Sequence, residues 1–401
     1  MLLYCKDIIP KICDIATDKT KISLSATCKL INGMKRDFVF REQINLGKIR
    51  MLPNFDNFEF ILINDMLVNV GWVTTIPKKA KKIYFKTKTT NIPQFVTHLT
   101  FCDSFDEPIQ DCIPDSVTHL VFGKQFDQPI ANCIPSSVSH LTFGHSFDQV
   151  IPNCLPASIT HLEFGWCFNK PIKNVIPKSV THLKFGWRFT QLIRDYIPDS
   201  VTHLEFDSPF NCSIENGIPN SVTHLTFGDS FNQSVEKYLP KSITHLKFGR
   251  SFCQPIENCE LDSLVQLELG GDYWRSIRKL CAKLTHLTIR EDLVQSICDC
   301  APLLTHLTLI CPVHSYKKAT GLTGPIGTFG NTGLISARPT LPIYFDFGQI
   351  PPSVTHLSFS LRFNKSLYFV PKSIIQISLP KDYNQKIIAG PDTKIIYRKT
   401  Y

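Results

Sequence analysis

The sequence predicts a solenoid of stacked coils, rich in parallel β-structure and with little helix in its repeats, preceded by a small α-helical N-terminal module. Histidine and phenylalanine each return eight times at a spacing of 21 residues without a slip, and the residues around them repeat one apolar pattern. Residues 1–45 lack this pattern and show short helical ones instead. The histidines are His98, His119, His140, His161, His182, His203, His224 and His245, and the phenylalanines are Phe105, Phe126, Phe147, Phe168, Phe189, Phe210, Phe231 and Phe252.

One coil, residues 113–130, shows what each position does. Val117, Leu120 and Phe122 follow the Leu-x-x-Leu-x-Leu spacing of a leucine-rich repeat, in which the last two apolar residues point inward from a short parallel strand. Pro114 lies in a turn signal before that strand. Because a coil of this kind cannot bury its apolar face alone, we expect the coils to be stable only when stacked.

The outer side of the coil has too few residues left for a helix, so we expect extended or 3-10 chain there. Phe126 and Ile130 should stack on their equivalents in the coils on either side. A short polar residue follows the buried phenylalanine, where it can satisfy backbone groups of the next coil. These residues are Asp127, Asp148, Asn169, Asn211 and Asn232.

The repeat extends beyond the regular coils at residues 92–259. Looser versions predict a solenoid over residues 76–379, joined to the N-terminal module by a connector and capping strand at 46–75, with a strand expected to begin at Phe58, and followed by a cap or tail at 380–401. Glycine recurs every third residue from Gly321 to Gly333, as in collagen, but five triplets are too few for a triple helix. The segment at about 312–347 is therefore predicted to be a surface loop inserted into one coil.

Eleven of the thirteen histidines lie at one position of the repeat. Three interpretations are open: a structural row, a partner-contacting surface, or a metal site. None of these histidines has a carboxylate of its own to orient it, and stacked imidazoles resist being protonated together. We therefore expect a structural row that is mostly neutral near pH 7, and no metal or other cofactor.

The number of cysteines, fifteen, is odd, and the first residues of the chain do not resemble a secretory signal. Both observations argue against a disulfide framework. Cys112, Cys133 and Cys154 share one position of the repeat with Val175, which predicts reduced thiols that fill space. The group of Cys281, Cys298, Cys300 and Cys311 fits no strong zinc spacing, and space filling is the preferred interpretation there too. We expect an intracellular protein, in the cytoplasm of a host cell, without a membrane-spanning segment.

The net charge of +9 is concentrated at the start of the chain. Residues 1–95 hold 16 Lys and Arg against 8 Asp and Glu, and the remainder holds 27 against 26. The coils therefore offer no basic stripe for a nucleic acid. The lysines at 78–82 are consistent with a nuclear-localisation or phosphate-binding patch, but the preferred interpretation is the solvated face of an edge coil, with lysine preventing unwanted strand pairing.

The repeated pattern Ile-Pro-x-Ser-Val-Thr-His-Leu-x-Phe-Gly-x-x-Phe-Asn/Asp-Gln-Pro-Ile resembles the FNIP repeat, a relative of the leucine-rich repeat known mainly from giant DNA viruses and social amoebae. The resemblance covers about residues 76–379 and is most specific at 92–259, because three later coils lose the Ile-Pro turn. It implies a protein-interaction solenoid and brings no catalytic residues.

Residues 1–45 resemble the F-box found at the start of many such proteins, through Ile9-Pro10 and the run Ser25-Ala-Thr-Cys-Lys-Leu. The usual acidic residue after the proline is missing, and the first helix is short. The resemblance implies docking on the adaptor subunit of a cullin-RING ubiquitin ligase. The alternative is a helical cap on the first coil. The contacting residues implied are Ile9, Pro10, Ile12, Ile15, Leu24 and Cys28.

The outward residue after the strand leucine changes freely, and two tryptophans recur one coil apart. We expect the target to dock there, through Glu163, Trp166, Lys184, Trp187 and Glu205. The predicted function is substrate recognition for an F-box type ubiquitin ligase, and the alternative is a repeat scaffold without a ligase. An enzyme is a distant third, because no nucleophile, carboxylate pair or phosphate loop stands outside the repeat.

Overall fold

The computed structural model describes residues 16–27, 38–69, 71, 73–152, 154–297, 300–311 and 345–398. The chain divides into two compact units, residues 1–191 and 192–401, which we describe in turn. Ile9, Pro10, Ile12, Ile15 and Cys28 lie outside the described residues, as does most of the predicted loop at 312–347.

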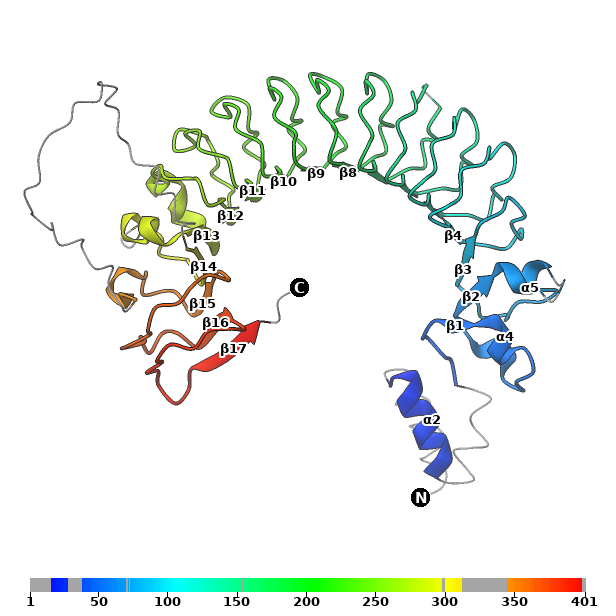
Figure 1. Ribbon diagram of the computed structural model, residues 1–401, viewed down its shortest axis with the longest axis horizontal. Helices are drawn as coiled ribbons and strands as arrows, with labels where there is room; N and C mark the ends of the chain where they lie inside the picture. Colours follow the sequence, from blue (N-terminus) through cyan, green and yellow to red (C-terminus); the bar gives the residue numbers. More distant parts are fainter. Residues whose placement is uncertain are drawn as a thin grey trace, which may run out of the picture. The chain divides into compact units, whose positions relative to one another are not determined.

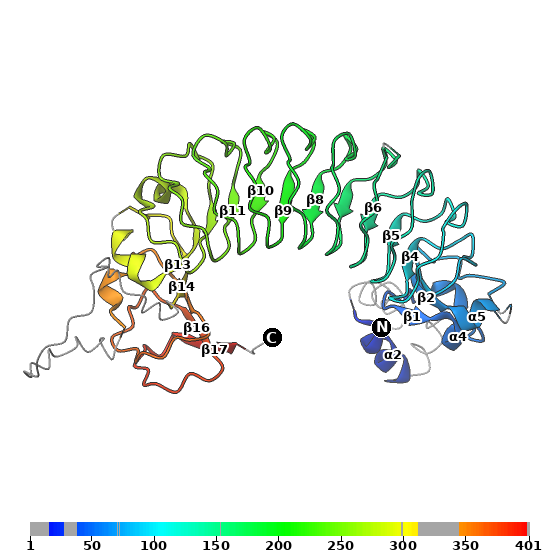
Figure 2. The same ribbon diagram turned by 45° about the horizontal axis from the view of Figure 1, so that its top comes forward.

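The first unit contains a stack of parallel strands in chain order (Figure 1). The pairing keeps one register, so that His98 lies beside His119 and Leu99 beside Leu120. Figure 2 shows the strands as a row of neighbouring arrows, and the remaining chain of each coil loops away from that row. The strands are β1 (Ile44–Asn45), β2 (Phe60–Asn64), β3 (Lys82–Thr87), β4 (His98–Phe101), β5 (His119–Val121), β6 (His140–Thr142), β7 (His161–Glu163) and β8 (His182–Phe185).

Strands β4 to β8 alternate between half-exposed and buried residues, as the period of a β-strand requires. In the coil of β5, Val117, Leu120, Phe122 and Phe126 are all buried. The turn before the strand closes through a hydrogen bond from the Val117 N–H to the Pro114 carbonyl, 3.0 Å. The leucine-rich-repeat-like fold predicted from the spacing is therefore confirmed, and no helix occurs in the described residues of the regular coils.

The start of the first unit differs from the predicted connector. The sheet does not begin at Phe58, because β1 precedes β2 and Phe40 forms a bridge with Phe58. Residues 46–75 also carry the short helices α4 (Leu46–Ile49), η1 (Phe55–Asn57) and α5 (Asp65–Asn69). Apolar runs of this length do not distinguish a strand from the short helical turns beside it.

One α-helix of the N-terminal module, α2 (Asp18–Thr27), is described. Its Lys21 is 1% exposed and donates to Asp18, 2.9 Å away, and to the carbonyl of Val39, 2.6 Å away. The other Asp18 oxygen accepts the N–H of Glu42 at 2.5 Å. Two side chains of the helix thus satisfy backbone groups of the chain that leads into the first strand.

The second unit contains coils of the same kind, and its later coils depart from the regular pattern. Three 3-10 helices, η2 (Arg278–Lys283), η3 (Glu291–Ser296) and η4 (Phe347–Gln349), occur here, and several strands are longer than those of the regular coils. Its strands are β9 (His203–Phe206), β10 (His224–Thr226), β11 (His245–Lys247), β12 (Gln266–Glu268), β13 (His286–Arg290), β14 (His306–Ile310), β15 (His356–Phe359), β16 (Gln376–Pro380) and β17 (Lys394–Arg398), and from β10 on each is parallel to the one before it.

Most strands of the regular coils are followed by a glycine, which the close approach of neighbouring coils requires. A Cβ built on Gly165 would lie 1.6 Å from the carbonyl oxygen of Gly144, and one on Gly186 would lie 2.1 Å from that of Gly165. These distances are far below van der Waals contact, so no larger residue fits without moving a coil.

The spacing between equivalent rings shows how the first unit curves. Histidine ring centroids on successive strands are 4.1 Å apart. The strand phenylalanines are 5.4–5.7 Å apart, and the outer phenylalanines 6.1–6.3 Å. Because the spacing grows away from the histidines, the strand face is the concave side of this unit.

Candidate functional site: the strand face and its flanking rows

The histidine row of the first unit, His98, His119, His140, His161 and His182, lies half-exposed on the strand face. Each ring stacks on its neighbours, and each Nδ1 lies 2.9 Å from the hydroxyl of the preceding Thr or Ser. Desolvation, together with the neighbouring imidazoles and Lys82, lowers the pKa of His98 to about 4. Burial first, and neighbouring histidines second or third, also lower the pKa of His140 and His161.

Those shifts bear on the three interpretations of the row. Stacked rings whose pKa values lie below 6.5 are neutral near pH 7, as the spacing predicts. Among the residues that the structure describes, no group of three or more His, Cys, Asp or Glu side chains is arranged to hold a metal ion. The parallel rings also point their nitrogens the same way, so adjacent imidazoles do not converge on one ion.

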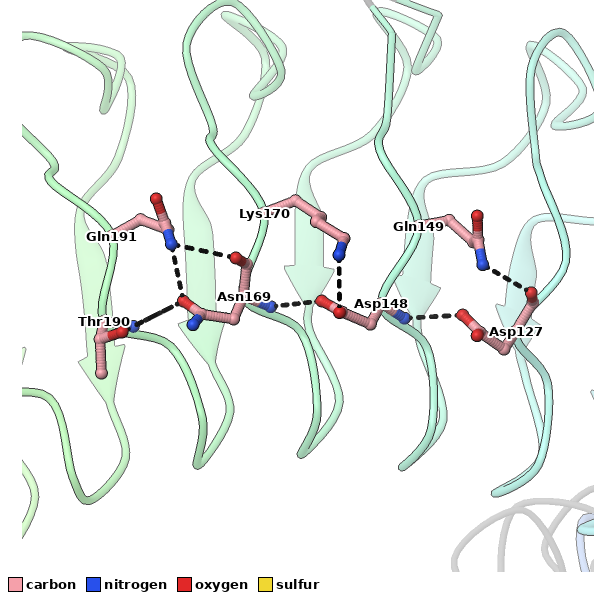
Figure 3. Close-up of polar contacts among 7 residues, drawn as sticks. All are labelled: Asp127, Asp148, Gln149, Asn169, Lys170, Thr190 and Gln191. Carbon is pink, nitrogen blue, oxygen red and sulfur yellow. Dashed lines mark hydrogen bonds and ion pairs between the residues drawn. The ribbon is translucent and has the colours of Figure 1, made fainter.

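A second row joins the coils on the side away from the histidines (Figure 3). The Asp148 N–H donates to Asp127 Oδ1 at 2.8 Å, and the Asn169 N–H donates to Asp148 Oδ1 at 2.8 Å. Gln149 and Gln191 reach back one coil to carbonyl oxygens at 3.0 Å. The second unit repeats the bond between Asn232 and Asn211. The predicted role of these residues, satisfying the backbone of the next coil, is confirmed.

The two predicted tryptophans form an exposed aromatic stack. Trp166 is 42% exposed and Trp187 is 38% exposed, and their rings stack with centroids 4.7 Å apart. His145, one coil earlier, stacks on Trp166 at 5.5 Å. Both tryptophans lie directly after the strand glycine, so they flank the strand face of the first unit, with large apolar edges in water.

The charged residues after the strand leucine are placed as the sequence predicts within the first unit. The Lys184 ammonium lies 3.2 Å from Glu163, and both side chains are exposed. Glu205 lies in β9 of the second unit, in register with Thr226. In that unit the same position gives a second pair, Lys247 with Glu268 at 2.9 Å.

The lysines at 78–82 do not belong to an edge coil, and that part of the prediction is wrong. Strand β3, which contains Lys82, is paired on both sides, with β2 and with β4. Lys78 pairs with Asp56 at 3.5 Å and Lys81 with Glu59 at 2.8 Å. Strand β3 is therefore an inner strand of the sheet, preceded by β1 and β2.

The repeated cysteines are only partly buried. Cys112, Cys133 and Cys154 are half-exposed, whereas Val175 at the same position is buried. Burial raises the pKa of Cys112 to about 11, and it also raises that of Cys133. These thiols are protonated at neutral pH and are poor nucleophiles.

Of the adaptor-binding residues implied by the F-box resemblance, only Leu24 lies within the described chain, in α2. Beside α2 the structure has a groove of about 650 Å³, lined among others by Ile22, Phe40, Ile44 and Leu52. The buried pair of Asp18 and Lys21 was missed from the sequence. The acidic residue three positions before a lysine at the start of α2 was its one signal, and it does not reveal burial.

The sequence was compared with models of known protein families. The model of the FNIP repeat matches residues 86–125, 108–146, 126–167, 147–187, 168–208, 210–238 and 231–272. The chain contains FNIP repeats. The FNIP matches overlap the regular coils at 92–259 that the 21-residue spacing defines.

Among solved structures, the chain is similar to CroV588, a circular leucine-rich-repeat protein from a giant virus, at 29% identity and a TM-score of 0.56. The alignment covers 85% of this chain and 56% of CroV588, so the chain spans little more than half of that protein. A leucine-rich-repeat protein from Bacteroides ovatus aligns at 13% identity over 89% of this chain and 76% of its own, with a TM-score of 0.15. No curated protein matches the chain. Within the described residues, no helix is long and apolar enough to cross a membrane.

Proposed function

We propose that the FNIP coils bind a target protein on the strand face of the first unit, with Glu163 and Lys184 in the contact and Trp166 and Trp187 at its edge. The observation that carries the proposal is the exposed tryptophan stack beside a concave face. Solvent-exposed aromatic rings held in one orientation lose little conformational entropy on binding, and tryptophan is enriched among the residues that dominate interfaces.

The test is binding of a target, isolated by affinity capture and then purified, to Trp166→Ala/Trp187→Ala. We expect the dissociation constant to rise about thirtyfold, which corresponds to about 2 kcal/mol of binding free energy, with little change in melting temperature. Trp274→Ala is the matched control, because Trp274 is 60% exposed and lies in the second unit. Unchanged affinity together with a large loss of stability would show that the rings serve packing alone.

We further propose that the N-terminal module recruits the adaptor of a cullin-RING ubiquitin ligase, which would make the protein a substrate receptor. Support comes from the F-box resemblance at Ile9-Pro10 and Ser25–Leu30, and from the apolar groove beside α2. The competing role, a cap on the first coil, is favoured by Asp18 and Lys21, which hold backbone groups of the chain entering the sheet.

Deleting residues 1–15 separates these roles, because α2 and its buried pair remain. We expect the deletion to abolish co-purification of adaptor and cullin while the melting temperature stays unchanged. Asp18→Ala/Lys21→Met is the complementary variant, and it should lower the melting temperature. If the deletion lowers the melting temperature and the adaptor never co-purifies with the full chain, the module is a cap and the ligase role is refuted.

A further inference from the structure

One part of the strand face, formed by β3 to β6 of the first unit, carries no acidic side chain. Its outward residues are donors, cations or neutral groups, and the four strands are consecutive neighbours in the sheet. We call it the acid-free face. Its outward residues are Lys82, Tyr84, Lys86, His98, Thr100, His119, Val121, His140 and Thr142.

The two lysines of this face differ from the other lysines around them. Lys78, Lys81 and Lys124 each form an ion pair. Lys82 and Lys86 are exposed and form no ion pair with a residue in the described part of the chain, and the ammonium of Lys82 lies over the ring of Phe60 at 5.8 Å. The carboxylate of Asp103 interacts with Lys86 but is paired with Lys124, so the two lysines leave an excess of positive charge beside the histidines.

The hydrogen bonds behind the histidine row decide what the rings present to solvent. The Thr118 hydroxyl lies 2.9 Å from His119 Nδ1 and 3.1 Å from the Thr97 carbonyl. That carbonyl already accepts two backbone N–H groups, at 2.9 and 3.1 Å, from Thr118 and His119. The single hydroxyl hydrogen can be donated either to this carbonyl or to Nδ1, and because the carbonyl already accepts two N–H groups we assign it to the shorter contact, with Nδ1.

The same arrangement recurs at the next coil, where the Ser139 hydroxyl is 2.9 Å from His140 Nδ1 and 3.2 Å from the Thr118 carbonyl. A neutral imidazole whose Nδ1 accepts a hydrogen bond must carry its hydrogen on Nε2. The row therefore presents N–H donors to solvent, next to the ammonium groups of Lys82 and Lys86.

We propose that the acid-free face binds an acidic segment of a partner protein, whose carboxylates accept hydrogen bonds from the imidazole N–H groups and pair with Lys82 and Lys86. This proposal rests on the proposed function, in which the strand face is the docking surface. It adds the chemistry of the partner segment that would lie on β3 to β6, the N-terminal part of that face. The face ends at β7, where Glu163 would repel an anion.

The size of the face favours a peptide over a nucleic acid. Four strands about 4.8 Å apart span roughly 14 Å, the length of four or five extended residues. The rings on this face, Tyr84 and the three histidines, already stack on one another and leave no ring face open for a base. Single-stranded nucleic acid is instead bound by several aromatic side chains with open faces along a longer basic track. Burial is the main cause of the lowered pKa of His98, His119 and His140, and Lys82 contributes to all three, so its charge acts on the three histidines of this face.

The test uses a fluorescently labelled oligoglutamate peptide, whose binding to the full chain is followed by anisotropy at low salt. We expect Lys82→Glu/Lys86→Glu to weaken binding more than tenfold. The matched control is Lys173→Glu/Lys178→Glu, which makes the same change in net charge at two exposed lysines on the turns of a later coil of the same unit and should stay within twofold. Thermal melting checks that both variants fold.

The histidines have their own readout. His119→Phe/His140→Phe keeps aromatic stacking and removes two donors, so binding should weaken about threefold, and nitrogen-15 NMR of the wild type should show Nε2–H tautomers. Equal weakening by the control lysine pair, or Nδ1–H tautomers with no effect of the histidine change, overturns the proposal. Tighter binding of a single-stranded oligothymidylate with the same dependence on Lys82 and Lys86 overturns it in favour of nucleic acid.

These outcomes can be told apart from failure of the proposed function. If Trp166→Ala/Trp187→Ala leaves target binding intact while oligoglutamate binding still requires Lys82 and Lys86, the tryptophan edge is refuted and the acidic-segment site stands. If the peptide fails to bind and the tryptophan variant loses the target, the strand face is the docking surface but its partner chemistry is different.

Discussion

The regular coils at 92–259 and the looser coils that follow solve the same packing problem with different residues. In the regular coils two phenylalanines recur in every coil, and a glycine and an Asp or Asn side chain recur in most of them. The later coils around β13 and β14 replace these with leucines, 3-10 helices and longer strands, yet keep Thr285-His286 and Thr305-His306 with the same 2.9 Å contact. The strand with its Thr-His pair is thus the part that both versions need, whereas the outer side tolerates replacement.

The largest loss of stability is expected when the glycine that follows a strand of a regular coil is replaced. Gly165→Val should prevent folding or cost roughly 4 kcal/mol, because its Cβ alone would lie 1.6 Å from a carbonyl oxygen of the coil before it. Gly271→Val is the control: it lies one residue after Gly270, the strand glycine of its own coil, and nothing lies within 4 Å of its Cβ, so stability should change little. Chemical denaturation measures both, and equal losses would show that the close approach at the strand glycine does not decide the cost.

The second largest loss of stability is expected from the row of Asp and Asn side chains that follow the outer phenylalanines and bond to the next coil. Asp148→Ala removes the acceptor of the Asn169 N–H and the partner of Lys170, 2.8 Å away, so we expect a loss of about 1–3 kcal/mol. Asp148→Asn keeps the acceptor and should retain most of the stability. The free energy of unfolding from denaturant curves is the measurement, and an equal loss in both variants would mean that charge, and not the acceptor, is what matters.

A smaller effect is expected from pH. The pKa of His98 falls to about 4 on folding, and that of His119 and His140 is lowered too, whereas an unfolded histidine titrates near 6.5. Between these values the unfolded chain binds more protons. Stability is therefore full above about pH 6.5 and falls as the pH decreases toward 4.

Melting temperatures between pH 7.5 and 5.5 test this, because the carboxylates stay ionised there. Replacing the three histidines by glutamine should flatten the slope. A slope that the replacement leaves unchanged would place the pH dependence elsewhere in the chain.

The smallest effect should come from the charged pairs on the strand face. Lys184→Ala and Lys247→Ala should each cost less than about 1 kcal/mol, because both pairs are exposed. The losses should shrink as salt is added. A cost that is large and independent of salt would indicate packing of the lysine stem.

The sequence was sufficient for the coil and its register, because the 21-residue period places every His beside a His and every Leu beside a Leu. It also predicted the role of the Asx side chains. The beginning of the sheet was not predictable, since β1 has two residues and no repeat pattern. The acid-free face was missed for another reason: Lys82 and Lys86 were counted with a basic segment, and only strand pairing shows that they share a face with His98.

The buried pair on α2 has a consequence for how the protein behaves in concentrated solution. The first strand of a parallel sheet offers unpaired amide and carbonyl groups to any passing chain. With Lys21 holding the Val39 carbonyl and Asp18 holding the Glu42 amide, two backbone groups of the segment that leads into the first strand are no longer available to a foreign strand. We therefore expect that weakening this helix increases turbidity on storage before any loss of secondary structure is seen.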